Sequence, residues 1–172
     1  YPDPRLHTVA KPVVAVNDAV RKLVADMAQT MYEAPGIGLA ATQVNVHQQV
    51  IVIDLSDERD QLQVFINPEI IAKEGLVTME EGCLSVPGFR GNVWRYTSIR
   101  VEALDRNGNK IDEIIRGMTA CTYQHEVDHL DGLLFMDKVK DTSTFATWDS
   151  FDKYKHHDFV VRVKELVAKF GS

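Results

Sequence analysis

The 172-residue chain is poor in cysteine, with only Cys83 and Cys121. Two thiols cannot build the dense disulfide framework of a small secreted domain, so we expect a reducing compartment. Long apolar runs are also missing: stretches such as VIVI at positions 50–53 have the length of a strand, not of a membrane span. There is no long basic run, and the formal net charge is −6. We therefore expect no direct binding to nucleic acid or to an anionic membrane surface.

What is present is the composition of an ordinary globular domain. Hydrophobic residues make up 45% of the chain and charged residues 26%, and a chain of this length can bury a real core. No internal repeat or low-complexity linker divides it, so we predict one domain over residues 1–172. The chain opens on Tyr1 rather than Met, without a signal-peptide pattern, which we interpret as a processed or trimmed form.

Three segments have the apolar periodicity of helices. The first is predicted to run to about Ala34 with Asn17 or Asp18 as its cap, and the second from about Met118 to Asp131. A C-terminal helix is predicted after a capping Asp158. The apolar stripe of the first helix is Val20, Leu23, Val24, Met27 and Met31, and that of the last is Phe159, Val163, Leu166 and Phe170. Pro35 ends the first helix and Gly132 the second.

Strands are predicted between these helices. Residues 48–55 and 63–72 are rich in β-branched residues, and residues 98–117 read as a hairpin that turns at Asn107-Gly108. Strands grouped between helices favour an α+β fold with antiparallel β-sheets. We expect these sheets to pack around the helix over residues 118–131, with the C-terminal helix added at the end.

The predicted central helix carries the motif H-E-x-x-H at His125, Glu126 and His129. Residues four apart lie on one face of a helix, so both imidazoles can reach one cation, with the glutamate beside them. In such a site the metal lowers the pKa of a water towards ~7, and the glutamate takes its proton as it attacks a carbonyl. The bland alternative is a solvated helix with incidental histidines.

A catalytic site of this kind has three protein ligands. Downstream lie His156, His157 and Glu165, but the motif does not continue as H-E-x-x-H-x-x-G-x-x-H, the pattern that would supply a third histidine. Upstream, Cys83 follows Gly82, where a glycine lets the backbone approach a metal or substrate closely. Cys121 lies one turn before His125, but three ligands along one helix would be strung over ~12 Å, too far for one tetrahedral ion. We therefore prefer Cys83 as the third ligand.

Three stretches occur in order: GIGLAATQ at 36–43, EGCLS at 81–85 and QHEVDH at 124–129. Together they resemble the peptide deformylases, and the likeness runs from YPDPRL to about Lys138. The resemblance implies a hydrolase that removes the N-formyl group from the N-terminal methionine of newly synthesised polypeptides and releases formate. It implies that Cys83, His125 and His129 hold the metal and that Glu126 is the general base and acid.

The same resemblance assigns the remaining site residues. Gln43 and the backbone N–H of Leu84 would stabilise the oxyanion on the formyl oxygen. The substrate-binding residues would be Gly36, Ile37 and Gly38, which pair with the peptide backbone, Glu81 and Gly82 of the EGCLS stretch, Arg90 near the outer end, and Met118 and Cys121 in the methionine pocket. For Arg90 a surface salt bridge is the alternative. Asp128 is expected to face away from the metal and to pair with Arg95.

The resemblance also implies one divalent ion, Fe²⁺ as the working metal, with Zn²⁺, Ni²⁺ or Co²⁺ in purified protein. The partners would be N-formylmethionyl nascent peptides, close to the ribosome exit. Bacterial cytoplasm is the expected location, and an organelle stays open. Two other functions stay open: a metallopeptidase that cleaves internal peptide bonds, and a metal- or peptide-binding module without turnover.

Beyond Lys140 the sequence departs from the compact bacterial pattern. Over residues 140–172, aromatic residues recur at spacings of three, which we interpret as a packing stripe rather than a partner-binding surface. They are Phe145, Trp148, Phe151 and Tyr154. This divergent tail leaves the subclass and the oligomeric state open.

Overall fold

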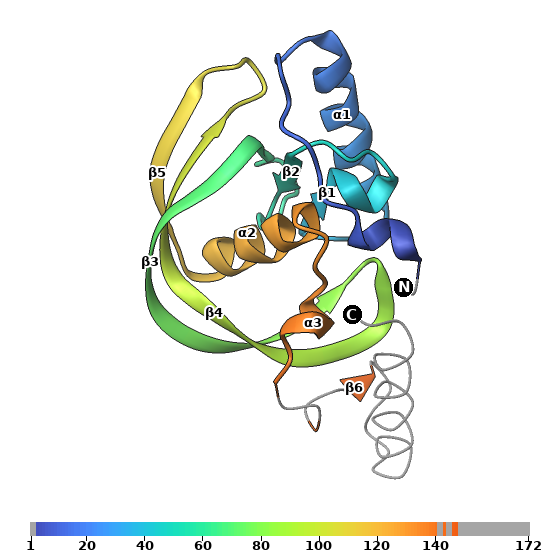
Figure 1. The fold of residues 1–172 in the computed structure, drawn as a ribbon, viewed down its shortest axis with the longest axis vertical. Coiled ribbons are helices and arrows are strands. Elements are labelled where there is room, and N and C mark those ends of the chain that lie inside the picture. Colours follow the sequence, from blue (N-terminus) through green and yellow to red (C-terminus); the bar gives the residue numbers. More distant parts are fainter. Residues whose placement is uncertain (1–2, 141–142, 144–145, 148–172) are drawn as a thin grey trace.

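A strongly curved antiparallel sheet wraps around one helix in the computed structural model, which describes residues 3–140, 143, 146 and 147 (Figure 1). The strands are β1 (Gly38–Ala40), β2 (Val50–Ile53), β3 (Gln63–Cys83), β4 (Val86–Leu104), β5 (Lys110–Arg116) and β6 (Ala146–Thr147). The α-helices are α1 (Asp18–Glu33), α2 (Gly117–Leu130) and α3 (Phe135–Lys138), and two 3₁₀ helices are η1 (Pro4–His7) and η2 (Ala41–Val44). The predicted α+β fold is confirmed.

Every strand pairs with its neighbours in antiparallel fashion, in the order β1-β2-β3-β4-β5, and β6 pairs with β4. The predicted hairpin is β4 and β5, with Leu104 opposite Lys110. Its turn is closed by a 3.0 Å hydrogen bond from Gly108 N–H to Asp105 C=O, and Gly108 has a φ of 82°, which favours glycine.

Strands β3 and β4 are much longer than predicted, because the sequence signals stop at Ala72 and resume at Ser98. No strand is predicted over the intervening residues, which contain Gly75, Gly82 and Gly88. In the structure the two strands stay paired across this region, and their register shifts at three places. Such irregularities bend a strand and increase its twist. The long ribbon therefore curves around α2 instead of ending (Figure 1).

Helix α2 is central, since ten of its 14 residues are buried. It begins one residue earlier than predicted and is followed by Gly132, whose φ is 75°. A Cβ atom at Gly132 would lie 2.6 Å from the backbone oxygen of His7, so the N-terminal segment requires glycine here. On the sheet side, the rings of Tyr123 and Phe65 meet edge to face, with 4.9 Å between centroids.

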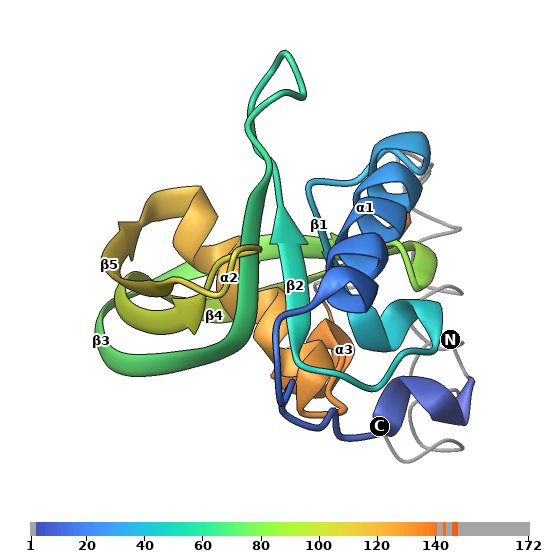
Figure 2. The ribbon, with the colours of Figure 1, turned by 90° about the horizontal axis from the view of Figure 1, so that it is seen from above.

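Strand β2 lies between α1 and α2 (Figure 2). Its side chains alternate: Ile51 and Ile53 belong to the core around α2, whereas Val50 and Val52 belong to the core beneath α1. Of the two predicted caps of helix α1, Asn17 and Asp18, the structure has Asn17, whose side chain accepts a 3.1 Å hydrogen bond from Val20 N–H. Its predicted stripe is buried except for Leu23, which is partly buried.

A third cluster of buried side chains packs α3 against the β3–β4 turn. No helix among the described residues has the length and apolarity to cross a membrane. The predicted C-terminal helix and all four members of the aromatic stripe lie outside the described residues.

Candidate metal centre

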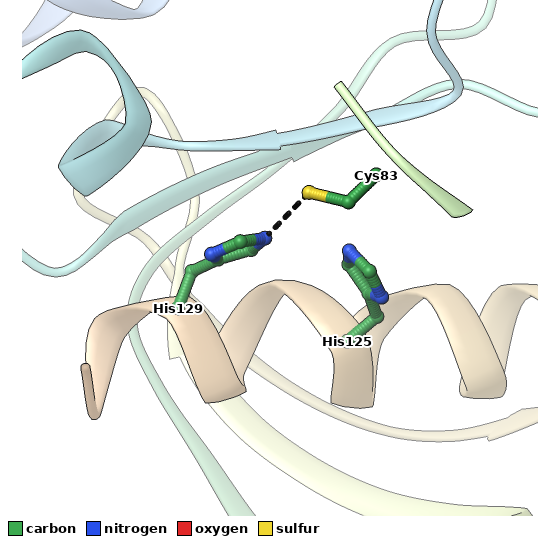
Figure 3. A group of neighbouring side chains, drawn as sticks. All are labelled: Cys83, His125 and His129. Atoms are coloured by element: carbon green, nitrogen blue, oxygen red, sulfur yellow. Dashed lines mark hydrogen bonds between the residues drawn. The ribbon is translucent and has the colours of Figure 1, made fainter. Parts of the chain in front are cut away.

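Cys83, His125 and His129 converge (Figure 3), and the first two of them line a cleft. Both histidines project from one face of α2, one turn apart, and Cys83 is the last residue of β3. One potential ligand atom from each residue lies within 4.8 Å of the other two. The Cys83 Sγ and His129 Nε2 atoms are 3.2 Å apart. Cys83 is more than 40 positions from either histidine in the sequence, and the fold brings it to them.

A buried chain of ionic contacts supports His125. Its Nδ1 lies 2.7 Å from Oε1 of Glu81, and Arg95 donates to both Glu81 oxygens at 2.6 and 2.8 Å. Arg95 also donates to Asp128 at 2.6 Å, which confirms the predicted pair, and Lys138 lies 3.0 Å from the other Asp128 oxygen. Arg95 is only 2% exposed, so these contacts are shielded from water.

The electrostatics of the two histidines differ. Burial acts to lower the pKa of His125, but its hydrogen bonds with Cys83 and Glu81 raise that pKa well above its ordinary value. Burial and the neighbouring His125 hold the pKa of His129 well below its ordinary value. Burial raises the pKa of Glu81 less than Arg95 and His125 lower it, and the result is a pKa of about 2. A permanent carboxylate therefore faces Nδ1 of His125.

Glu126 is 3% exposed and also lines the cleft. Burial raises the pKa of this carboxyl group to about 7. Its Oε2 atom has no hydrogen-bond partner within the part of the chain that the structure describes. Gly38 gives it room, because a Cβ atom there would lie 2.7 Å from Oε1 of Glu126. Glu126 is thus a buried acid in the same cleft as Cys83 and His125, and among the described residues its Oε2 atom has no hydrogen-bond partner.

Gln43 is oriented by its neighbours. Its Oε1 accepts a 2.9 Å hydrogen bond from Ala40 N–H, and its Nε2 donates to Ser85 Oγ at 2.9 Å. Nε2 also lies 3.5 Å from Cys83 Sγ, so the amide nitrogen is turned towards the ligand cluster. Leu84 and Ser85 form the two-residue turn between β3 and β4, in which Cys83 pairs with Val86.

The cleft has a volume of about 760 Å³. All the predicted site residues line it except His129, which is completely buried behind it. Those that line it are Gly36, Ile37, Gly38, Gln43, Glu81, Gly82, Cys83, Leu84, Arg90, Met118, Cys121, His125 and Glu126. Met118 is 50% exposed and Cys121 is 5% exposed, which places a mobile thioether at the rim and a small apolar group inside.

Three of these residues make contacts within the protein that bear on their predicted roles. The carboxylate of Glu81 is engaged with Arg95 and His125 rather than open to the cleft. A Cβ atom at Gly82 would lie 3.4 Å from the backbone oxygen of Phe89, so what approaches this glycine closely is strand β4. Arg90 makes the ion pair considered as its alternative, with Glu80 at 3.1 Å, while it also lines the cleft.

Sequence reasoning missed other residues that shape the cleft. Thr122 lines it, and its hydroxyl donates a 2.9 Å hydrogen bond to Met118 C=O. Ser85 accepts a hydrogen bond from Gln43; it is part of the EGCLS stretch, but no role was predicted for it. Met79 and Phe89 come from the parts of β3 and β4 that were not predicted as strands. Only Thr122 carried a usable signal, since it lies one turn before Glu126 on the same helix face.

Comparisons with known proteins agree with this geometry. The family model described as polypeptide deformylase matches residues 1–145. The peptide deformylase of Pseudomonas aeruginosa is 57% identical over 138 residues, which cover 80% of this chain and 82% of that protein. The peptide deformylase of Cellvibrio japonicus is 59% identical over 140 residues, covering 81% and 83%.

Solved structures show the same likeness. A peptide deformylase from Synechococcus elongatus, in complex with actinonin, superposes with a TM-score of 0.80 at 38% identity, covering 94% of this chain and 84% of that one. A peptide deformylase from Legionella pneumophila gives a TM-score of 0.78 at 37% identity, covering 97% and 94%. Sequence and fold therefore point to one group of proteins.

Proposed function

The chain belongs to the peptide deformylase family, and on that premise we propose how its residues remove the N-formyl group from the N-terminal methionine of new polypeptides. The family is one of metal-dependent hydrolases. The single observation that carries the proposal is the convergence of one thiol and two imidazoles, with the buried Glu126 in the same cleft as Cys83 and His125.

The donor set fits a divalent metal ion. Cys83, His125 and His129 offer one sulfur and two nitrogen atoms, which is the three-ligand pattern that leaves a position open for substrate or water. A bound ion would supply Lewis acidity and lower the pKa of a water in the site. We propose Fe²⁺ as the working metal, with Zn²⁺, Ni²⁺ or Co²⁺ as occupants in purified protein.

Glu126 is proposed as the general base and acid. Its unengaged carboxylate oxygen can take the proton of the attacking water and then give it to the leaving amine. The Nε2 of Gln43 and the backbone N–H of Leu84 are proposed to donate hydrogen bonds to the formyl oxygen as negative charge develops there. Gln43 suits this role because Ala40 and Ser85 already fix its orientation, so little reorganisation is needed.

We propose that Gly36, Ile37 and Gly38 pair with the backbone of the peptide, as an added strand does. Met118 and Cys121 would line the pocket for the methionine side chain, and Arg90 would border the outer end together with Gly82. For Glu81, the contacts favour orienting His125 over binding the substrate. Its carboxylate holds Nδ1 of His125, which leaves Nε2 to bind the ion.

The setting follows from the substrate. We propose that the chain works as one catalytic domain in the bacterial cytoplasm, near the ribosome exit, where formylated chains emerge. Curated relatives from Pseudomonas aeruginosa and Cellvibrio japonicus support a bacterial source.

The test is formate release from a formyl-Met tripeptide by anaerobically purified, Fe²⁺-loaded protein, run beside digestion of an unfolded protein substrate. We expect formate without internal cleavage. Internal cleavage without formate would establish the metallopeptidase alternative, and tight binding of formyl peptide without either product would establish the binding module.

A further inference from the structure

The loop between β2 and β3 holds the cleft edge formed by Gly36 and Ile37 from behind. Strand β1 begins only at Gly38, so these two residues precede its ladder with β2. The carbonyl oxygen of Ile37 accepts a 2.9 Å hydrogen bond from Asp54 N–H, and that of Gly36 accepts one from the Arg59 guanidinium. Both carbonyl groups are thus engaged by a loop that does not line the cleft itself.

Arg59 is held in place from two sides. Its backbone has a φ of 57°, a left-handed conformation that is uncommon outside glycine and marks a constrained turn. Its guanidinium carbon lies 5.0 Å from the centre of the Tyr32 ring, as in a cation–π contact. A planar guanidinium can stack on the ring and donate to a carbonyl at the same time, which a lysine ammonium does less well.

The loop is built around one buried carboxylate. Asp54 is 1% exposed and accepts hydrogen bonds from Tyr32 Oη at 2.6 Å, Ser56 N–H at 2.9 Å and Gln61 N–H at 3.1 Å. The Ser56 hydroxyl donates to it as well. Tyr32 belongs to α1, so the arrangement ties α1, the loop and the cleft edge together.

The cleft edge has little freedom to move alone. Gly36 N–H donates a 2.7 Å hydrogen bond to Met31 C=O, and a Cβ atom at Gly36 would lie 2.6 Å from Cδ1 of Leu84. Leu84 is the residue whose N–H is proposed to face the formyl oxygen. A shift of Gly36 would therefore displace the proposed peptide-binding edge.

We propose that Arg59 is a positioning residue that fixes the Gly36–Ile37 edge, through its hydrogen bond to Gly36 and its stack on Tyr32, and so governs how well the substrate backbone binds. This inference rests on the proposed pairing of residues 36–38 with the peptide. An edge that binds substrate and transition state alike changes KM rather than kcat when it loosens.

The test compares Arg59→Ala and Arg59→Lys with the matched control Arg100→Ala, which removes an exposed arginine paired with Asp112 on the far part of the sheet. We expect Arg59→Ala to raise KM for a formyl-Met tripeptide about tenfold, with kcat within about twofold of wild type. The change for formyl-Met amide, which lacks further backbone, should be much smaller. Arg59→Lys should recover only part of the loss.

Amide hydrogen exchange gives a second readout that does not need turnover. In Arg59→Ala the segment 36–40 should exchange faster while β2 keeps its protection, and Arg100→Ala should match wild type. The inference is overturned if Arg59→Ala leaves both KM and amide exchange unchanged, or if it lowers kcat equally for both substrates. It is also overturned if Arg59→Lys restores the wild-type KM in full. If wild type itself releases no formate, the proposed function fails, and exchange alone then decides whether Arg59 restrains the edge.

Discussion

The Glu81 carboxylate lies 2.7 Å from Nδ1 of His125, and both residues are about nine-tenths buried. A metal-binding histidine that donates its other N–H to a carboxylate has a fixed tautomer and ring orientation, and is a better ligand for it. The geometry of the proposed ligand His125 therefore depends on Glu81, which is not itself a proposed ligand.

Replacing this carboxylate should weaken metal binding. For Glu81→Gln we expect the affinity for the divalent ion to fall about 10- to 100-fold, because the amide removes the charge that holds His125. Competition with a chelator of known affinity measures this. Glu80→Gln is the matched control, since Glu80 is the exposed neighbour that pairs with Arg90. Equal affinities for the two variants would contradict the supporting role of Glu81.

Removing the buried arginine should destabilise the whole domain. Arg95→Met leaves the carboxylates of Glu81 and Asp128 buried without their main partner. Breaking a buried ion pair in this way costs about 3–5 kcal/mol of unfolding free energy. Denaturant unfolding measures the loss, with Arg100→Met as the exposed comparison. A loss no larger than that of Arg100→Met would mean that Arg95 is not needed to neutralise these groups.

Adding one methyl group at the cleft edge should slow the reaction. In Gly38→Ala, the new Cβ atom would lie 2.7 Å from Oε1 of Glu126 and 2.9 Å from Cγ2 of Thr122, so the carboxylate must move. A displacement of about 1 Å in a catalytic group can cost about a hundredfold in rate. We expect kcat to fall by at least about tenfold while metal content stays at one ion per chain. Wild-type kcat in a fully loaded variant would show that Glu126 needs no such room.

Asp54 makes stability depend on acidity. Burial raises the pKa of this group, but hydrogen bonds from Ser56 and Tyr32 outweigh burial and lower the pKa from 3.8 to about 2. A pKa below its unfolded value stabilises the fold above about pH 4, and that contribution disappears as the pH falls towards about 2. Asp54→Asn should therefore show a shallower loss of unfolding free energy over this window in denaturant titrations. Parallel curves for the two proteins would contradict the assignment.

Much of the site could be predicted from the sequence because its residues occur in three short, ordered motifs. His125 and His129 share a face by helical periodicity alone. Cys83 needed a chemical argument, since its approach to the histidines depends on how β3 curves around α2. The Asn107-Gly108 hairpin and the Asn17 cap were predictable because turn and cap chemistry act locally.

The parts that could not be predicted depend on tertiary contacts. No strand was predicted over residues 73–97, and it is the pairing of β3 with β4 that makes strands of most of them. The partners of Glu81 were hidden because Arg95 is 14 residues away on another strand. Arg59 looked like one more loop charge, and only the fold brings it against Tyr32 and Gly36.

Glu126 is proposed to transfer protons at a metal held by Cys83, His125 and His129. This role is tested most directly by measuring kcat for formate release together with metal content in wild type and Glu126→Gln. The glutamine has nearly the same shape, so the variant should keep one ion per chain and lose about 10²- to 10⁴-fold in kcat. A metal-loaded Glu126→Gln protein with wild-type kcat would contradict the account.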